Sequence, residues 1–122
     1  MDTFNFERLT VWQKAIELVI LVYRLTTKFP KEELYGLSSQ VRRAVVSIPS
    51  NIAEGKSRGT RKDFAQFIKI AFASGAELET QIEIAKRLSL ADPIDYNEID
   101  RLLNEVMRML NTLIIKLGSP AT

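Results

Sequence analysis

Residues 95–118 read DYNEIDRLLNEVMRMLNTLIIKLG, and this stretch carries the clearest structural signal in the chain. Its apolar side chains recur at the spacing of one face of an α-helix. Asp95 is expected to cap the start, with Glu98 as its capping partner, and Gly118 and Pro120 follow as stop signals. We therefore predict a helix over residues 96–117, with a core-facing stripe of Ile99, Leu102, Leu103, Val106, Leu110, Leu113 and Leu117.

The preceding residues, 61–90, predict the longest helix of the chain. Thr60 stands before it, Asp63 lies three residues later in a capping position, and the helix ends before Asp92-Pro93. The short link to the last helix makes the two antiparallel neighbours. One face of this helix is apolar and is expected to be buried: Phe64, Phe67, Ile68, Ala71, Gly75, Leu78 and Ile82.

The first half of the chain predicts two further helices, over residues 11–28 and 36–55. Thr10 is expected to cap the first, with Gln13 as its partner, and Pro30 stops it. Pro49 lies inside the second and removes one backbone hydrogen bond, which predicts a kink or a tight turn there. The core-facing residues are Val11, Ala15, Leu18, Val22 and Leu25 in the first helix, and Val41, Ala44, Val45, Ile48 and Ile52 in the second.

These four segments predict an all-α protein, an up-down-up-down antiparallel four-helix bundle. No alternation of apolar and polar residues indicates a strand. At 122 residues, of which 46% are apolar, the chain is long enough to fill one core. We therefore expect residues 1–122 to form a single domain.

The composition excludes several kinds of site. The chain has no Cys and no His, which excludes disulfides, Cys/His zinc sites, histidine-dependent catalytic triads and the Glu-x-x-His sites of di-iron bundles. Oxygen-only magnesium or calcium sites stay possible, but we expect no metal and no cofactor. The longest apolar run is six residues, Leu18 to Tyr23, against the roughly 20 that a membrane span needs. No signal-peptide core opens the chain, so we expect a cytoplasmic protein with no membrane partner.

Two of the predicted helices are apolar on a second side. Trp12, Ile16, Ile20 and Tyr23 lie away from the buried stripe of the first helix, and Ile70, Ala73, Ile84 and Leu88 lie away from that of the third. A second apolar face on a small protein indicates a subunit interface. The alternative is that these are scattered surface residues, which are common. We expect an oligomer interface formed by Trp12, Ile16, Ile20, Tyr23, Ile70, Ala73 and Ile84.

The positive charge is concentrated in the first part of the chain. Residues 1–69 hold 12 Lys or Arg and 7 Asp or Glu, whereas residues 70–122 hold 5 and 8. Four cations fall between residues 56 and 62, where one helix ends and the next begins, and backbone amides at a helix start also favour anions. The segment lacks the Walker pattern of nucleotide hydrolases. Phosphate is the expected ligand, although a basic loop can also be plain solvated surface. The candidate nucleic-acid-binding residues are Arg42, Arg43, Lys56, Arg58, Arg61 and Lys62.

No catalytic residue is predicted. Glu79 and Glu83 are one helical turn apart, but no base, nucleophile or orienting group accompanies them. Ser47, Ser50 and Asn51 surround Pro49, and their expected role is to bond the local backbone.

Several long motifs give the chain a family resemblance. They are Phe6-Glu7-Arg8-Leu9, Val11-Trp12-Gln13, Phe29-Pro30, Glu33-Leu34-Tyr35-Gly36-Leu37, Gln40-Val41-Arg42-Arg43-Ala44, Ser47-Ile48-Pro49-Ser50-Asn51-Ile52-Ala53-Glu54-Gly55 and Glu77-Leu78-Glu79-Thr80-Gln81. With these motifs the chain resembles the bacterial four-helix-bundle proteins encoded by intervening sequences within 23S ribosomal RNA genes. The resemblance implies a ring, expected to be a pentamer. It also implies kinship with accessory proteins of diversity-generating retroelements, which bind nucleic acid and a reverse transcriptase.

The preferred hypothesis from the sequence is a non-enzymatic, homo-oligomeric adaptor that binds nucleic acid, with RNA as the expected form. The main alternative is a protein-interaction scaffold, such as an accessory subunit of a reverse transcriptase, with no direct contact to nucleic acid. A third reading is a nuclease that holds a metal through Glu79 and Glu83.

Overall fold

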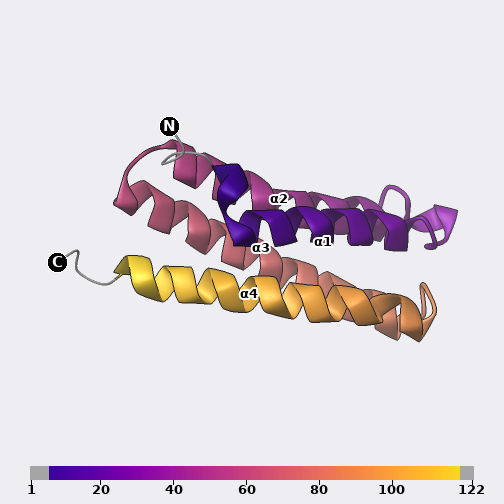
Figure 1. The fold of residues 1–122 in the computed structure, drawn as a ribbon. Coiled ribbons are helices and arrows are strands. Elements are labelled where there is room, and N and C mark those ends of the chain that lie inside the picture. The colour runs from indigo at the N-terminus through magenta and orange to yellow at the C-terminus, as the bar shows by residue number, and fades with distance from the viewer. Residues whose placement is uncertain (1–5, 119–122) are drawn as a thin grey trace.

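The computed structural model describes residues 6–118 and consists of four α-helices (Figure 1). They are α1 over Thr10–Thr26, α2 over Leu37–Ser57, α3 over Arg61–Arg87 and α4 over Asn97–Gly118. No end of a helix differs by more than three residues from its expected position. The all-α class is confirmed, because the spacing of the apolar residues follows the helical period in all four segments.

The helices form an up-down-up-down bundle, as expected. Helix α1 packs against α2 and α4, and α3 packs against the same two helices, so α1 and α3 lie on opposite corners. The α2–α3 turn and the end of α4 lie at one end of the bundle, and the links α1–α2 and α3–α4 lie at the other (Figure 1). The short three-residue link between α2 and α3 therefore places the cations of residues 56–62 at one end.

The core consists of the expected stripes, with one residue buried about every turn on each helix. Leu18, Val45, Leu78 and Val106 are fully buried, one from each helix. Phe67, Leu113 and Leu117, which the sequence pattern also assigned to the core, are only half-buried because they lie at the edges or the end of their stripes. No helix among residues 6–118 is both long enough and apolar enough to cross a bilayer.

Helix α2 runs without interruption through Pro49, so the expectation of a tight turn there is wrong. The proline ring is buried. Side chains on the next turn tie the segment down: the Asn51 Nδ2 atom donates to the Ser47 carbonyl over 2.8 Å and to its hydroxyl over 2.9 Å. The Ser47 hydroxyl in turn lies 2.8 Å from that of Ser74 on α3. This network fixes α2 against α3 at the point where the proline weakens the helix.

Two of the three expected helix caps are wrong. Helix α1 begins at Thr10 itself, with Leu9 in the cap position and no side-chain cap. Asp95 lies inside a short 3-10 helix, Pro93–Tyr96, that leads into α4, and its carboxylate binds the Lys28 ammonium over 2.7 Å. The third expected cap is present, because the Asp63 amide donates to the Thr60 hydroxyl over 3.0 Å at the start of α3.

Candidate functional site

The turn between α2 and α3 is the candidate site for anions. Helix α2 ends at Ser57, and Gly59 adopts a positive φ of 86°, a conformation that favours glycine and lets the chain reverse within three residues. Thr60 then caps α3, whose first amides point toward the same end. The reversal therefore gathers the cations of residues 56–62 beside a helix start, where the helix dipole is positive.

Two cations of the turn are held against aromatic rings. The Lys56 Nζ atom lies 5.3 Å from the centre of the Phe64 ring, and the guanidinium carbon of Arg58 lies 4.9 Å from the centre of the Phe67 ring. Arg58 also forms an ion pair with Glu54 one turn back on α2, at 2.9 Å. Each exposed cation–π contact contributes about 0.5–1 kcal/mol. These contacts limit where the two cations can lie, but both side chains remain partly accessible.

Arg61 has a structural contact that the sequence did not indicate. Its Nη2 atom donates to the Lys116 carbonyl oxygen over 2.7 Å, across from α3 to the last turn of α4. A carbonyl in the last turn has no partner within its own helix, and the guanidinium supplies one. Arg61 therefore joins α3 to α4 as well as adding charge, whereas Lys62 beside it is exposed to solvent.

Arg42 and Arg43 do not belong to the same site as the turn. Along α2 they lie about 22 Å from Arg58, since each residue of a helix rises 1.5 Å. The Arg42 Nε atom donates to the Thr26 hydroxyl over 2.8 Å, and its guanidinium lies 4.7 Å from the centre of the Tyr23 ring, so it joins α2 to α1. Arg43 is exposed. The six cations named from the sequence thus separate into a group at the turn and a pair near the other end of α2.

The residues expected at an oligomer interface are mostly exposed. Between 36% and 47% of the surface of each large one is accessible: Ile16, Ile20, Tyr23, Ile70 and Ile84. Ala73 is exposed as well. Trp12 differs, because it is half-buried and packs edge-on against Phe6, with ring centres 5.4 Å apart. The sequence reading missed five further exposed apolar residues, of which the first two lie in the α1–α2 link: Leu34, Tyr35, Val46, Ile94 and Ile115.

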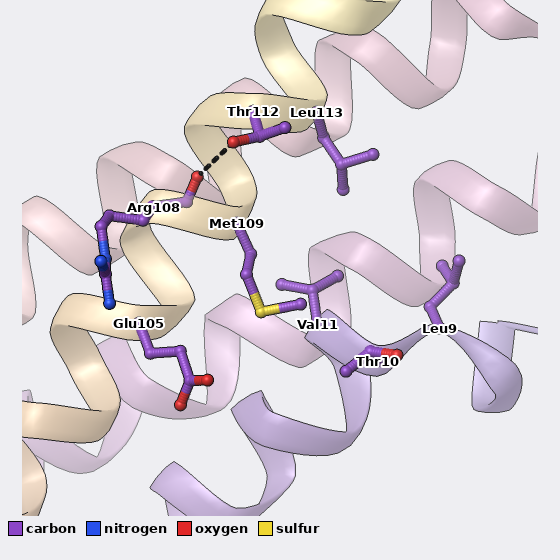
Figure 2. Close-up of a pocket in the computed structure, with 8 residues that line it drawn as sticks. All are labelled: Leu9, Thr10, Val11, Glu105, Arg108, Met109, Thr112 and Leu113. Carbon is purple, nitrogen blue, oxygen red and sulfur yellow. Dashed lines mark hydrogen bonds between the residues drawn. The ribbon is translucent and has the colours of Figure 1, made fainter.

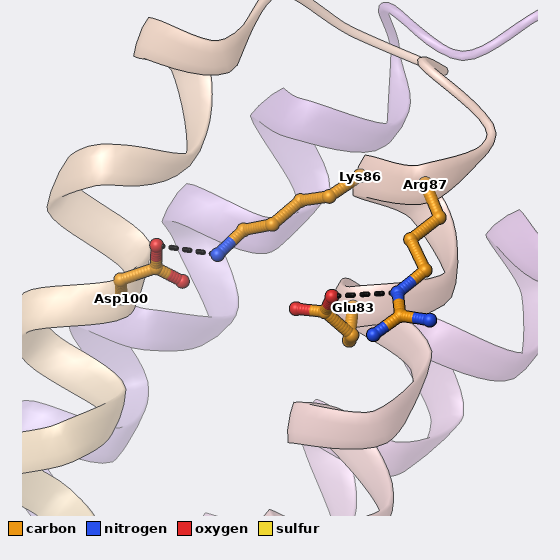
Figure 3. A network of polar contacts seen from close by, with 4 residues as sticks. All are labelled: Glu83, Lys86, Arg87 and Asp100. Carbon is orange, nitrogen blue, oxygen red and sulfur yellow. Dashed lines mark hydrogen bonds and ion pairs between the residues drawn. The ribbon is translucent and has the colours of Figure 1, made fainter.

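Of the two carboxylates considered as a pair, Glu79 and Glu83, the second is engaged in an ion pair. Glu83 binds the guanidinium of Arg87 on its own helix at 2.9 Å, while Lys86 reaches across to Asp100 of α4 at 2.7 Å (Figure 3). Within residues 6–118 no group of three or more His, Cys, Asp or Glu side chains could hold a metal ion. Glu83 is therefore better explained as part of the solvated ionic surface of α3.

A groove of about 620 Å³ lies between the start of α1 and the last turns of α4. Figure 2 shows Met109 of α4 pointing toward Val11 of α1, with Arg108 and Glu105 on the α4 side of the groove. The Thr112 hydroxyl donates to the Arg108 carbonyl over 3.0 Å, so it is satisfied within α4. The groove is open and mainly apolar, and it holds no group that marks a reaction centre.

With the fold and the turn described, comparison with known proteins identifies the family. The family model described as 23S rRNA-intervening sequence protein matches residues 7–112. The chain belongs to this family. The match covers all of α1, α2 and α3 and most of α4, so the four-helix bundle is the unit that the family shares.

One solved structure has a similar fold. It is a protein of unknown function from the S23 ribosomal protein family of Bacteroides thetaiotaomicron, with a TM-score of 0.79 and 25% sequence identity. The similarity covers 86% of this chain and 95% of that one. No match was found among curated proteins. The comparisons thus establish the family and the fold.

Proposed function

We propose that this protein is a non-enzymatic, homo-oligomeric adaptor that binds nucleic acid through the cationic end of its bundle. The observation that carries the proposal is the cluster of Lys56, Arg58, Arg61 and Lys62 at the capped start of α3. Amides at a helix start and nearby guanidinium groups are the donors that phosphate oxygens accept from in proteins. Phosphates of a nucleic acid would therefore bind across this turn.

RNA is the proposed form of the ligand, and the support for it is the family itself. Members are described as proteins of 23S rRNA intervening sequences, and the solved relative is assigned to a ribosomal protein family. The turn offers cations rather than a pocket for a base, so binding would be weakly specific for sequence. Affinity would fall steeply as salt rises, because bound counterions are released when cations neutralise phosphates.

Self-assembly would strengthen this binding. A single turn with four cations makes few phosphate contacts, whereas a ring presents the same turn once per subunit. Linked sites bind a long polyanion with an affinity well above that of one site. The exposed apolar side chains of α1 and α3 support assembly, and the family resemblance leads us to expect a pentamer.

The binding site can be tested with two variants that change the net charge equally. The first replaces Arg58, Arg61 and Lys62 with Ala at the turn, and the second replaces Lys31, Arg87 and Arg101 with Ala at the opposite end. In gel shifts with RNA across a salt series, the first should lose binding and the second should keep it. Circular dichroism would check that both remain helical, which matters because Arg61 also holds α4. An equal loss of binding in both variants would show that net charge alone is responsible and that the site is assigned wrongly.

The alternative function is a scaffold that docks a partner protein, such as a reverse transcriptase, without touching nucleic acid. The exposed apolar residues of α1 and α3 favour it equally well, since they would suit a foreign protein. A defined partner that stays bound to this protein after nuclease treatment, and that is released by changes to α1 or α3 but not to the turn, would support the scaffold over the adaptor.

A further inference from the structure

An open recess of about 750 Å³ lies where the last turns of α1, the α1–α2 link and the first half of α2 meet. It is named here the tyrosine–arginine recess, because Tyr23 of α1, Tyr35 of the link, and Arg42 and Arg43 of α2 line it. Among residues 6–118, the charged residues of its lining are these two arginines, with no carboxylate. Since the recess includes the α1–α2 link, it lies toward the end of the bundle away from the cationic turn (Figure 1). It is therefore a second basic surface, separate from the turn.

Tyr35 presents almost its entire side chain to solvent. It is 94% exposed, more than any other large apolar residue that the structure describes, and Tyr23 is 40% exposed. A tyrosine this accessible adds little to the core, and its ring is free to stack on a flat partner. Leu34 and Val46 line the same recess and are also more than a third exposed. The recess thus combines an accessible aromatic ring with apolar surface.

The two arginines keep donors available for an anion. The Arg42 Nε atom donates to the Thr26 hydroxyl over 2.8 Å, and its guanidinium carbon lies 4.7 Å from the centre of the Tyr23 ring. These contacts orient the guanidinium, whose other N–H groups have no hydrogen-bond partner within residues 6–118. Arg43, the next residue, is exposed to solvent.

Arg43 remains available although an acidic residue lies near it. On the side of α2 that faces α3, Arg43 lines a second recess together with Glu77. No ion pair joins the two in the part of the chain that the structure describes, and the Glu77 carboxylate accepts from the Gln81 amide over 3.5 Å. The guanidinium of Arg43 can therefore reach a ligand of the tyrosine–arginine recess.

We propose that the tyrosine–arginine recess binds an unpaired base of a single-stranded nucleic acid, with the base stacked on Tyr35 and its neighbouring phosphates bound by Arg42 and Arg43. This inference rests on the nucleic-acid binding proposed above and adds which form of strand is bound. Aromatic rings beside cations suit single strands, because every base has a flat face and every nucleotide has a phosphate. The bases of a duplex are stacked on one another, so a duplex would offer the recess its phosphates alone.

The charges of the lining favour a nucleotide over a partner protein, since both are positive and match a polyanion. Tyr23 was expected at an oligomer interface, but Arg42 already lies over its ring, and Ile16 and Ile20 remain exposed on α1 for a contact between copies. The recess and the turn lie about 22 Å apart along α2. The turn would bind the phosphates of single strands and duplexes alike, whereas the recess adds stacking for single strands. The protein should therefore bind a single strand more tightly than a duplex.

Fluorescence anisotropy with two labelled probes tests the proposal: a short single-stranded oligoadenylate and a blunt-ended RNA duplex of equal length. Tyr35→Ala removes an exposed ring and leaves the core intact. It should weaken binding of the oligoadenylate by about 5- to 150-fold, which corresponds to the loss of one stacked base, and leave binding of the duplex unchanged. Tyr35→Trp should restore binding of the single strand. Ile94→Ala is the control, because Ile94 is 74% exposed in the α3–α4 link at the same end of the bundle, and this variant should bind both probes as the parent does.

Unchanged binding of the oligoadenylate by Tyr35→Ala would overturn the proposal and leave the recess to a partner protein. An equal loss for the duplex would overturn it as well, because stacking on an unpaired base could not be the cause. Adenosine monophosphate that competes as tightly as the oligoadenylate would overturn it in favour of a free nucleotide, whereas weak competition would support a strand. The variant with Arg58, Arg61 and Lys62 replaced by Ala should lose both probes. If that variant binds like the parent while Tyr35→Ala loses the single strand, the site at the turn fails and the recess stands, and the reverse result overturns the recess alone.

Discussion

The contacts that join α4 to its neighbouring helices differ in chemistry from those that join α2 to the same helices. Along α4, lysines of both neighbours reach carboxylates, as Lys14 does to Glu105 and Lys86 to Asp100. Along α2, the connecting contacts are hydroxyl groups and cations stacked on aromatic rings, and isoleucines of α1 and α3 remain exposed. The difference teaches that ion pairs satisfy the polar groups of an exposed seam, whereas exposed apolar side chains, which also line the groove between α1 and α4, remain available for a contact.

The largest expected effect comes from placing a charge on the exposed apolar side of α1 or α3. Ile20→Asp and Ile84→Asp should each convert the assembly into single chains, because a carboxylate buried in the contact would lack a partner. Light scattering at high protein concentration measures the change in mass directly. Circular dichroism should show unchanged helicity, since both side chains project from the bundle.

Ile115→Asp is the matched control for that comparison. Ile115 is 64% exposed, more than either of the other two isoleucines, but it belongs to α4. The mass of this variant should equal that of the parent. If it dissociates while the other two do not, the subunit contact lies on α4 and not on α1 and α3.

The next effect concerns the two glycines at which helices approach most closely. A Cβ atom added at Gly55 of α2 would lie 2.5 Å from the Cβ of Phe67, which is fixed near the backbone of α3. One added at Gly75 of α3 would overlap the sulfur of Met107, at the flexible end of a side chain on α4. Gly55→Ala should therefore destabilise the bundle by about 1–3 kcal/mol, whereas Gly75→Ala should change its stability by less than about 1 kcal/mol.

Urea unfolding at one fixed protein concentration would measure both glycine variants, since assembly couples to stability. Alanine favours a helix over glycine by up to about 1 kcal/mol at either position, so that contribution cancels in the comparison. A Gly75→Ala variant less stable than Gly55→Ala would mean that the α3–α4 seam, and not the α2–α3 seam, is the rigid one.

The four helices could be predicted because their determinants are local. The apolar period is visible in sequence, and the link of residues 58–60 is too short to allow anything but an antiparallel return. The errors arose where a distant residue competes with a local one. Asp95 looks like a cap beside Glu98, but Lys28, far away in sequence, binds it instead. Pro49 looks like a break, yet burial of its ring and the bonds of Asn51 keep the helix continuous.

The position of the candidate site could be predicted from the sequence, but the contacts of its residues could not. Residues 56–62 stand out as a cluster because four cations follow one another closely. The contact of Arg61 with the last turn of α4 joins residues 55 apart, and no sequence pattern indicates it. Likewise, Arg42 and Arg43 share a motif, but adjacent residues on a helix point about 100° apart, so one reaches Thr26 and the other faces solvent.

A smaller effect is expected at Tyr96, where the chain enters α4. Its side chain is 1% exposed, and its hydroxyl has no hydrogen-bond partner among residues 6–118. Burial, followed by the charges of Asp95 and Asp100, raises the pKa of Tyr96 above its ordinary value. The folded protein therefore holds this proton more tightly than the unfolded chain does. The stability that results is present below the ordinary tyrosine pKa of about 10 and is lost as the pH rises through the raised folded value.

Tyr96→Phe tests this point on the α4 side. The variant should keep its neutral-pH stability within about 1 kcal/mol, because no hydrogen bond is lost. Above pH of about 10 it should lose less stability than the parent, as measured by urea midpoints at neutral and alkaline pH. Parallel alkaline losses in the two proteins would show that another group controls unfolding there.

The smallest effects on stability are expected from two substitutions that each remove one carboxylate. Asp100→Asn removes a partly exposed ion pair with Lys86, so it should cost less than about 1 kcal/mol, shrink further at high salt, and leave the assembly intact. Glu77→Gln also removes one carboxylate, but from the side of α3 that exposes Ile70 and Ala73, where we propose a subunit contact. That change should leave the stability of the subunit almost as it was and weaken assembly on dilution, measured by light scattering. If instead Asp100→Asn dissociates the oligomer and Glu77→Gln does not, the ion pairs along α4 are part of a subunit contact, and the side of α3 that carries Glu77 faces solvent.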